Sequence, residues 1–335
     1  MNDGASAARG RILAAGLSAV VLGGCAFDGP QSTVVARSDF ARDILGVYAV
    51  ITWAAVGIAA VVFVVLGWVL WRYRARPDAP LPRQTRGHTW LEIGWTVAPA
   101  LVLLVIAVPT LQVIFRTQGG AAPGALTVVV RGWQWWWEIR YPDLGVVTAN
   151  ELHLPLGRPA VLQLEGADVI HSLWVPQLGG KRDVVPGRVN RITLTPEVAG
   201  EYLGQCAEFC GPSHANMRLR VVVQPPGEFE RWVATQRAPA AEAAGPAAEG
   251  QQVYARSACV GCHTVRGLSA GVVGPDLTHF GSRRTVGAGL LPATPENVAA
   301  WVRDPAALKP GVKMPALGLS EAEARAVAAY LLSLK

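Results

Sequence analysis

Two long runs without a charged residue restrict the fold of this chain more than any other feature of its sequence. Residues 44–71 form 28 consecutive uncharged positions, and residues 93–115 form 23. A helix that spans a membrane needs about 20 mainly apolar residues. Pro99 and Pro109 interrupt the second run, but spanning helices tolerate proline where neighbours satisfy the freed backbone groups. The sequence therefore predicts two transmembrane helices within residues 44–116.

The loop between the two runs, residues 72–92, is strongly basic. Five arginines stand against two acidic residues there: Arg72, Arg74, Arg76, Arg83, Arg86, Asp78 and Glu92. Short basic loops remain in the cytoplasm, so both helices are expected to exit on the opposite side of the membrane. The composition of the whole chain, 51% hydrophobic and 16% charged, agrees with a membrane protein.

Residues 1–24 predict a secretory signal peptide. Arg9 and Arg11 precede a short apolar run that ends in small residues, which is the usual pattern of a signal sequence. Leu22-Gly-Gly-Cys25 resembles the cleavage site of bacterial lipoproteins, which implies cleavage before Cys25 and lipidation of its thiol. The alternative is an ordinary signal peptide with an incidental cysteine. Residues 25–43 then form a segment outside the membrane.

Residues 125–232 have the pattern of an all-β domain. Short runs rich in β-branched residues alternate with turns that contain Gly, Pro and Asp, which favours a sandwich. The expected strands are 126–130, 151–154, 160–164, 191–195 and 218–223.

Within this domain, one stretch of twelve residues contains two thiols, an imidazole and a thioether: Cys206, Cys210, His214 and Met217. A second imidazole, His171, lies 35 positions before Cys206. This set of soft ligands suits copper, whereas tetrahedral zinc sites rarely use methionine. The alternative is a Cys206–Cys210 disulfide with an unrelated histidine and methionine nearby.

The pattern C-x-E-x-C-x-x-x-H-x-x-M, with His-Ser-Leu-Trp-Val-Pro upstream, resembles the dinuclear copper site (CuA) of cytochrome c oxidase subunit II. The resemblance implies a cupredoxin-like sandwich in which both thiolates bridge two copper ions. His171 and Met217 would complete one copper. His214 and the backbone carbonyl of Glu208 would complete the other.

The same resemblance implies roles for three further residues. Trp135, one of four tryptophans within residues 133–137, corresponds to the tryptophan that relays electrons to CuA. The alternative is that these rings brace the domain against the membrane. Glu92 corresponds to a glutamate at the mouth of a proton channel in the catalytic subunit. Asp183, with Glu208, would lie near a magnesium ion at the subunit interface.

Residues 233–249 are rich in Ala, Pro and Glu and predict a linker. Residues 250–335 contain Cys259-Val-Gly-Cys262-His263, the attachment sequence of a c-type haem. A bare C-x-x-C could also belong to a redox or zinc site, but the adjacent His263 favours haem.

The second axial ligand of this haem is expected to be Met314, because methionine opposite histidine holds a high potential and Met217 is assigned to copper. Gly274-Pro-Asp-Leu277 resembles the cytochrome c segment whose proline carbonyl orients the axial histidine. A capped helix is expected from Ser320 to Leu334, where Glu323 follows the serine by three positions. The domain is therefore expected to be an all-α class I cytochrome c.

The whole chain is thus predicted to be a multi-domain membrane protein with a transmembrane hairpin, a cupredoxin-like CuA domain and a cytochrome c domain. It resembles subunit II of a bacterial caa-type cytochrome c oxidase. The resemblance implies a subunit of a proton-translocating oxidoreductase in the inner membrane, with both redox domains on the periplasmic side. Electrons would pass from a donor, cytochrome c or quinol–cytochrome c reductase, through haem c and CuA to a catalytic subunit that reduces oxygen to water.

Two other functions remain open at this point, a CuA subunit of a nitric oxide reductase and a free-standing membrane electron carrier. The sequence contains no phosphate-binding glycine loop and no basic helix with interleaved aromatic residues, so no nucleic-acid partner is expected.

Overall fold

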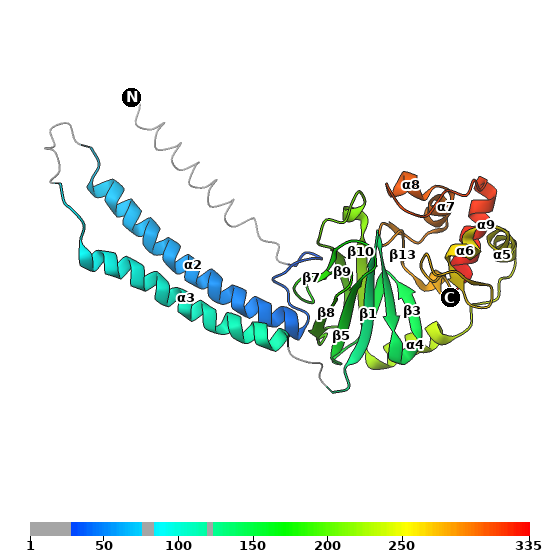
Figure 1. Ribbon diagram of the computed structural model, residues 1–335, viewed down its shortest axis with the longest axis horizontal. Coiled ribbons are helices and arrows are strands. Elements are labelled where there is room, and N and C mark those ends of the chain that lie inside the picture. The colour runs from blue at the N-terminus through cyan, green and yellow to red at the C-terminus, as the bar shows by residue number, and fades with distance from the viewer. Residues whose placement is uncertain (1–27, 76–83, 119–122) are drawn as a thin grey trace, which may run out of the picture.

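The computed structural model describes residues 28–75, 84–118 and 123–335. A helical hairpin, a β-sandwich and a small helical domain follow one another along these residues, with the hairpin and the helical domain at opposite ends of the molecule (Figure 1). This order agrees with the predicted fold class. The predicted signal peptide and Cys25 lie outside the described residues.

The hairpin consists of α2 (Asp39–Arg72) and α3 (Thr89–Thr117). At 34 and 29 residues, both are long and apolar enough to cross a membrane. Ser38 begins α2 and also fixes it to the sandwich, because its hydroxyl accepts from the amide of Ala41 at 3.1 Å and donates to the carbonyl of Leu178 at 2.7 Å. Arg116 pairs with Asp43 at 2.8 Å across the two helices.

The sandwich has two five-stranded sheets. One has the order β3-β2-β1-β5-β8 and the other β4-β10-β9-β6-β7. The strands are β1 (Leu126–Trp133), β2 (Trp136–Tyr141), β3 (Val146–Ala149), β4 (Glu151–Pro155), β5 (Ala160–Gly166), β6 (His171–Trp174), β7 (Arg182–Val184), β8 (Val189–Leu194), β9 (Gly200–Cys206) and β10 (Arg218–Gln224). All five predicted strands are present, and five more were not predicted.

Alternating burial along the strands builds the core between the two sheets. In β10, Leu219, Val221 and Val223 are buried while their neighbours are more exposed, which is the period-two pattern of a strand with one face in the core. β1 pairs with β5 in parallel, and β9 lies antiparallel to both β10 and β6. Because β6 begins at His171 and β9 ends at Cys206, the second sheet brings these two side chains to the same end of the sandwich.

The C-terminal domain is mainly helical: α5 (Pro246–Arg256), α6 (Cys259–Cys262), α7 (Pro295–Arg303), α8 (Pro305–Leu308) and α9 (Glu321–Ser333), with short pairs β11 (Thr264–Val265), β12 (Ser269–Ala270), β13 (Thr285–Val286) and β14 (Leu291–Pro292). Ser320 and Glu323 form the predicted capping box at the start of α9. A Cβ on Gly250 would lie 1.9 Å from the carbonyl oxygen of Ala326, so only glycine permits the close crossing of α5 and α9.

The predicted linker, residues 233–249, is shorter in the structure. Helix α4 (Pro226–Arg237) covers its first part because Phe229 and Val233 bury one helix face, and α5 begins at Pro246. Of the residues between these helices, Ala240 and Ala243 pack against the core of the C-terminal domain. The helical domain lies directly on the sandwich, beside its ligand-bearing end (Figure 1).

Candidate functional site

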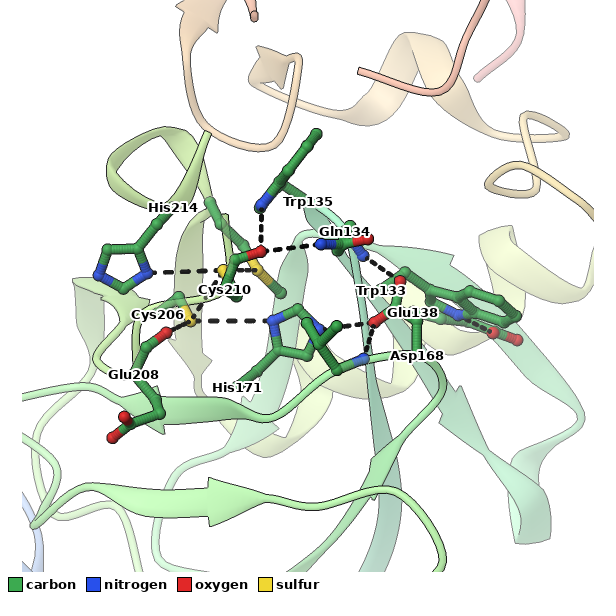
Figure 2. Close-up of polar contacts among 12 residues, drawn as sticks. Trp133, Gln134, Trp135, Glu138, Asp168, His171, Cys206, Glu208, Cys210 and His214 are labelled. Carbon is green, nitrogen blue, oxygen red and sulfur yellow. Dashed lines mark hydrogen bonds and ion pairs between the residues drawn. The ribbon is translucent and has the colours of Figure 1, made fainter. Parts of the chain in front are cut away.

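The side chains of His171, Cys206 and Cys210 converge at one end of the sandwich (Figure 2). The two Sγ atoms are 3.8 Å apart. Nδ1 of His171 lies 3.9 Å from Sγ of Cys206, and Nδ1 of His214 lies 3.5 Å from Sγ of Cys210. Sδ of Met217 is 4.0 Å from Sγ of Cys210. This is a buried set of soft donors of the kind that binds copper.

A carbonyl oxygen completes the set. The backbone oxygen of Glu208 lies 3.3 Å from Sγ of Cys206, whereas its carboxylate points away from the sulfurs (Figure 2). The hydrogen bond from Cys210, with further help from His171, lowers the pKa of Cys206 to about 3, and the shared proton raises the pKa of Cys210. One thiolate, the form that binds a metal, is therefore already favoured by the fold.

Asp168 orients the His171 ring from its other side. Its Oδ1 lies 2.9 Å from Nε2 of His171, and its Oδ2 accepts from the amide of Gln134 at 2.8 Å. A carboxylate accepts only, so Nε2 carries a proton, and in the neutral ring the lone pair of Nδ1 is available for a metal bound beside the sulfurs. Burial lowers the pKa of His171, but Cys206 and Asp168 outweigh this and raise it overall.

The carbonyl oxygen of Cys210 faces the C-terminal domain and accepts two hydrogen bonds. Nε1 of Trp135 donates to it at 3.0 Å and Nε2 of Gln134 at 2.9 Å. Trp133 and Trp136 stack on each other with ring centroids 6.0 Å apart, and Trp137 is fully buried with its ring beside His171. Two of the four tryptophans therefore touch the predicted copper site directly, Trp135 through the carbonyl of Cys210 and Trp137 through the ring of His171.

A cavity of about 400 Å³ lies in the C-terminal domain and reaches the sandwich. Its walls include Cys262, His263 and Met314 from one domain and Trp135 from the other. This volume lies within the range of small-molecule cofactor sites. Cys259 is buried beside it in α6, and none of the four described cysteines forms a disulfide.

The residues of the cavity fit a haem. Nδ1 of His263 donates to the carbonyl of Pro275 at 2.8 Å, as predicted, so Nε2 is left with its lone pair for a metal. Burial lowers the pKa of His263, which keeps the ring neutral. A Cβ on Gly274 would lie 2.5 Å from this ring. Nε of Arg283, which lines the cavity, is buried without a hydrogen-bond partner, and a haem propionate would satisfy it.

Comparison with known proteins agrees with the hairpin, the sandwich and the C-terminal helical domain. The family model for the cytochrome c oxidase subunit II transmembrane domain matches residues 31–113, that for its periplasmic domain residues 146–224, and that for cytochrome c residues 247–335. Cytochrome c oxidase subunit 2 of Alkalihalophilus pseudofirmus is 38% identical over 83% of this chain and 83% of its own length.

The chain belongs to the cytochrome c oxidase subunit II family. Subunit 2 from Bacillus sp. strain PS3 is 37% identical over 79% of this chain and 80% of its own length. The periplasmic domain of subunit II from Bradyrhizobium japonicum is 32% identical and covers 36% of this chain and 96% of its own, with a TM-score of 0.34. The family implies a CuA copper centre and an association with other oxidase subunits in a membrane, and the cytochrome c domain implies haem c.

The structure of this subunit II brings together all the residues predicted for the copper and haem sites. Glu92 lies elsewhere, in the first turn of α3, at the end of the hairpin remote from the sandwich (Figure 1). Asp183 lies in β7, where its backbone carbonyl accepts from Asn190 at 2.8 Å.

Three residues of the site in this subunit II were not predicted: Gln134, Asp168 and Lys309. Asp168 precedes His171 by three positions, so its closeness in the sequence could have indicated that it contacts the His171 ring. Gln134 is adjacent to the predicted Trp135. Lys309 carries no signal in the sequence, because two of its three hydrogen-bond partners belong to another domain.

Proposed function

We propose that this subunit receives electrons at its cytochrome c domain and passes them to its copper domain, with Trp135 between the two sites. Copper and haem supply the one-electron chemistry, and the chain holds and connects them. Cys206 and Cys210 would hold the copper ions through their thiolates. The remaining copper ligands would be His171, His214, Met217 and the carbonyl of Glu208.

In the cytochrome domain, Cys259 and Cys262 would attach the haem, and His263 and Met314 would hold its iron. Two thiols at this spacing hold the haem covalently, and the Pro275 carbonyl keeps His263 in the orientation and tautomer that an axial ligand needs. The buried guanidinium of Arg283 would pair with a propionate.

One observation carries the proposal. Trp135 lines the cavity that contains His263 and Met314, and its indole nitrogen donates to the carbonyl of Cys210. The side chain is only 5% exposed, so the indole lies away from bulk water. A single aromatic residue thus connects the haem cavity to a copper ligand.

The membrane setting extends the proposal to partners. Arg72, Arg74 and Arg86 lie at the ends of the helices away from the sandwich, and the positive-inside rule would put that side in the cytoplasm. Both redox domains would then face the periplasm, where a cytochrome c or a quinol–cytochrome c reductase is the proposed donor. The proposed acceptor is the catalytic subunit I in the inner membrane.

Three finer roles also remain proposals. Glu92, at the cytoplasmic end of α3, would assist proton uptake by the catalytic subunit. Asp183 and Glu208 would contribute to a magnesium site where this subunit meets subunit I. Cys25 would carry a lipid.

Rapid mixing of the purified oxidase with reduced donor tests the main proposal. Haem c absorbance should change first, the near-infrared band of CuA should follow, and oxygen consumption should accompany both. If CuA is reduced before haem c, or at the same rate when haem c is absent, the proposed order is wrong. Turnover of nitric oxide instead of oxygen would assign the chain to a different reductase.

A further inference from the structure

Lys309 is a buried lysine at the contact between the two redox domains. It follows α8 in the cytochrome domain and is only 2% exposed. A buried lysine needs partners for its charge and its donors. Lys309 lines the haem cavity, but its hydrogen bonds go to residues that are not predicted copper or haem ligands, so its position requires a further explanation.

Three backbone carbonyls surround the Lys309 ammonium. Nζ donates to the oxygen of Trp135 at 2.7 Å, to that of Asn216 at 2.8 Å and to that of Gly287 at 2.8 Å. An ammonium has three N–H donors, so donors and acceptors match in number. Burial lowers the pKa of Lys309 to about 7, and the three carbonyl dipoles stabilise the ammonium against that burial.

The three carbonyls come from both domains. Gly287 belongs to the cytochrome domain, whereas Trp135 and Asn216 belong to the copper domain. Trp135 contacts both redox sites, and Asn216 is adjacent to Met217 in the ligand loop. If Lys309 were removed, the three carbonyls would each lose a hydrogen-bond donor while they stay buried at the domain contact. The loss of a donor by a buried carbonyl is unfavourable. One side chain thus ties the cytochrome domain to the two segments that line the copper site.

Neighbouring contacts place Lys309 at the centre of the domain contact. The hydroxyl of Ser213 donates to the carbonyl of Pro310 at 2.6 Å. Gly311 lies against the indole of Trp135. Ion pairs between the domains lie farther out, since Lys313, which pairs with Asp168, is 62% exposed, and Arg284, which pairs with Glu201, is 61% exposed. Exposed pairs of this kind contribute little to binding.

We propose that Lys309 is a positioning residue that fixes the cytochrome domain on the copper domain, so that Trp135 stays in contact with both the haem cavity and Cys210. This inference rests on the proposed path of electrons from haem c to CuA. If the tie is lost, the docked arrangement is populated only part of the time, and the observed transfer rate falls in proportion to that fraction.

The test uses the assembled oxidase in detergent with three variants. Lys309→Met keeps the length of the side chain and removes the charge and all donors. Lys309→Gln is milder because its amide keeps two donors. Arg303→Met is the matched control, because it removes one positive charge from an exposed position six residues away in the same domain.

Two rates are measured, the reduction of haem c by the donor and the electron transfer from haem c to CuA after flash photoreduction of haem c. Lys309→Met should slow the internal transfer at least about tenfold, and Lys309→Gln should slow it less. The reduction of haem c should be unchanged. The copper resonance and the haem spectrum of the oxidised protein should match the wild type, which separates loss of position from loss of a metal site.

Solvent viscosity provides a second signature. A transfer that waits for the domain to return should become slower in viscous buffer in the Lys309 variants, and stay insensitive in the wild type. The inference is overturned if both Lys309 variants keep the wild-type transfer rate within twofold, or if Arg303→Met slows it equally. If Lys309→Met does not assemble, Lys309→Gln decides. If the wild type itself shows no transfer from haem c to CuA, it is the proposed function that fails.

Discussion

The indole nitrogen of Trp135 donates to the backbone carbonyl of Cys210 at 3.0 Å, while the same indole ring forms part of the wall of the haem cavity. One side chain therefore touches a proposed copper ligand and the proposed haem site at the same time. Gln134 donates to the same carbonyl, so the position of Cys210 does not depend on the indole alone. This arrangement allows the contribution of Trp135 to electron transfer to be separated from its contribution to folding.

Trp135→Phe should slow electron transfer and leave the copper site loaded. Phenylalanine keeps an apolar ring but loses the donor to Cys210, at a cost of about 1 kcal/mol, and Gln134 still satisfies that carbonyl. Rapid mixing should show haem c reduced at the normal rate while CuA lags. If CuA reduction keeps pace in the variant, electrons reach the copper by another route and Trp135 serves only to pack the domain contact.

Two of the proposed sulfur ligands, Cys210 and Met217, should differ in their importance for the copper site. Cys210→Ser removes a proposed bridging thiolate and should abolish the mixed-valence copper resonance, while the haem c spectrum is kept. Met217→Leu should be milder, because an axial thioether tunes the potential of copper more than it holds the metal, and leucine fills a similar volume. An unchanged copper resonance in Cys210→Ser would contradict the ligand assignment.

The clustering of two thiols, an imidazole and a thioether was predictable from sequence because these residues are close together in the chain. Cys206, Cys210, His214 and Met217 lie within twelve residues, from the last residue of β9 to the residue before β10, so their spacing alone constrains the site. The helices of the hairpin were predictable because lipid requires uncharged residues over a full span. His263 and Met314 are far apart in the chain; the haem attachment sequence indicated His263, and Met314 was inferred because methionine opposite histidine holds a high potential and Met217 was assigned to copper.

Other parts of the fold depend on contacts that the sequence does not display. Strand β9 was not predicted because it contains Gly200 and Gly204, which have a low propensity for strands. A Cβ on Gly204 would lie 2.9 Å from Val175, so glycine is needed where β9 passes that side chain. The residues around 240 predicted a linker, whereas Ala240 and Ala243 pack on the cytochrome domain. The role of Lys309 is not visible in the sequence, because its three hydrogen bonds form together only when both domains are in contact.

His153 should make the stability of the sandwich depend on pH. Its ring stacks on Trp232 with centroids 4.1 Å apart, and its Nδ1 lies 2.9 Å from Oε1 of Gln224. Burial lowers the pKa of His153 to about 4, against about 6.5 in the unfolded chain. Between these values the unfolded chain binds a proton that the folded chain does not, so folding becomes less favourable as pH falls from 6.5 to 4, by at most roughly 3 kcal/mol.

His153→Phe keeps a flat ring on Trp232 and removes the titrating group. Urea unfolding in detergent, followed by tryptophan emission at pH 4.5 and 6.5, should show a smaller loss of stability on acidification in the variant than in the wild type. Equal losses in both proteins would assign the acid sensitivity to other groups.

The contact between Gly311 and Trp135 should be sensitive to a single methyl group. Gly311 has φ +79°, and a Cβ there would lie 3.0 Å from Cη2 and 3.3 Å from Cζ3 of the indole. Gly318 in the same domain has φ +70° and no neighbour within 4 Å of its Cβ position. Alanine at either position adopts a left-handed conformation at a cost of roughly 1–2 kcal/mol, so the backbone strain of the two substitutions is matched.

Gly311→Ala adds to this strain a displacement of the Trp135 ring, whereas Gly318→Ala adds nothing. Both variants should therefore unfold at similar urea concentrations. Only Gly311→Ala should slow the transfer of electrons from haem c to CuA, severalfold, because the new methyl group either shifts the indole away from the haem cavity or separates the two domains. Limited proteolysis between residues 238 and 245 distinguishes these two causes, since only separation of the domains should speed cleavage there. If both variants transfer electrons at the wild-type rate, close packing of Gly311 against Trp135 is not required for the connection between the two sites.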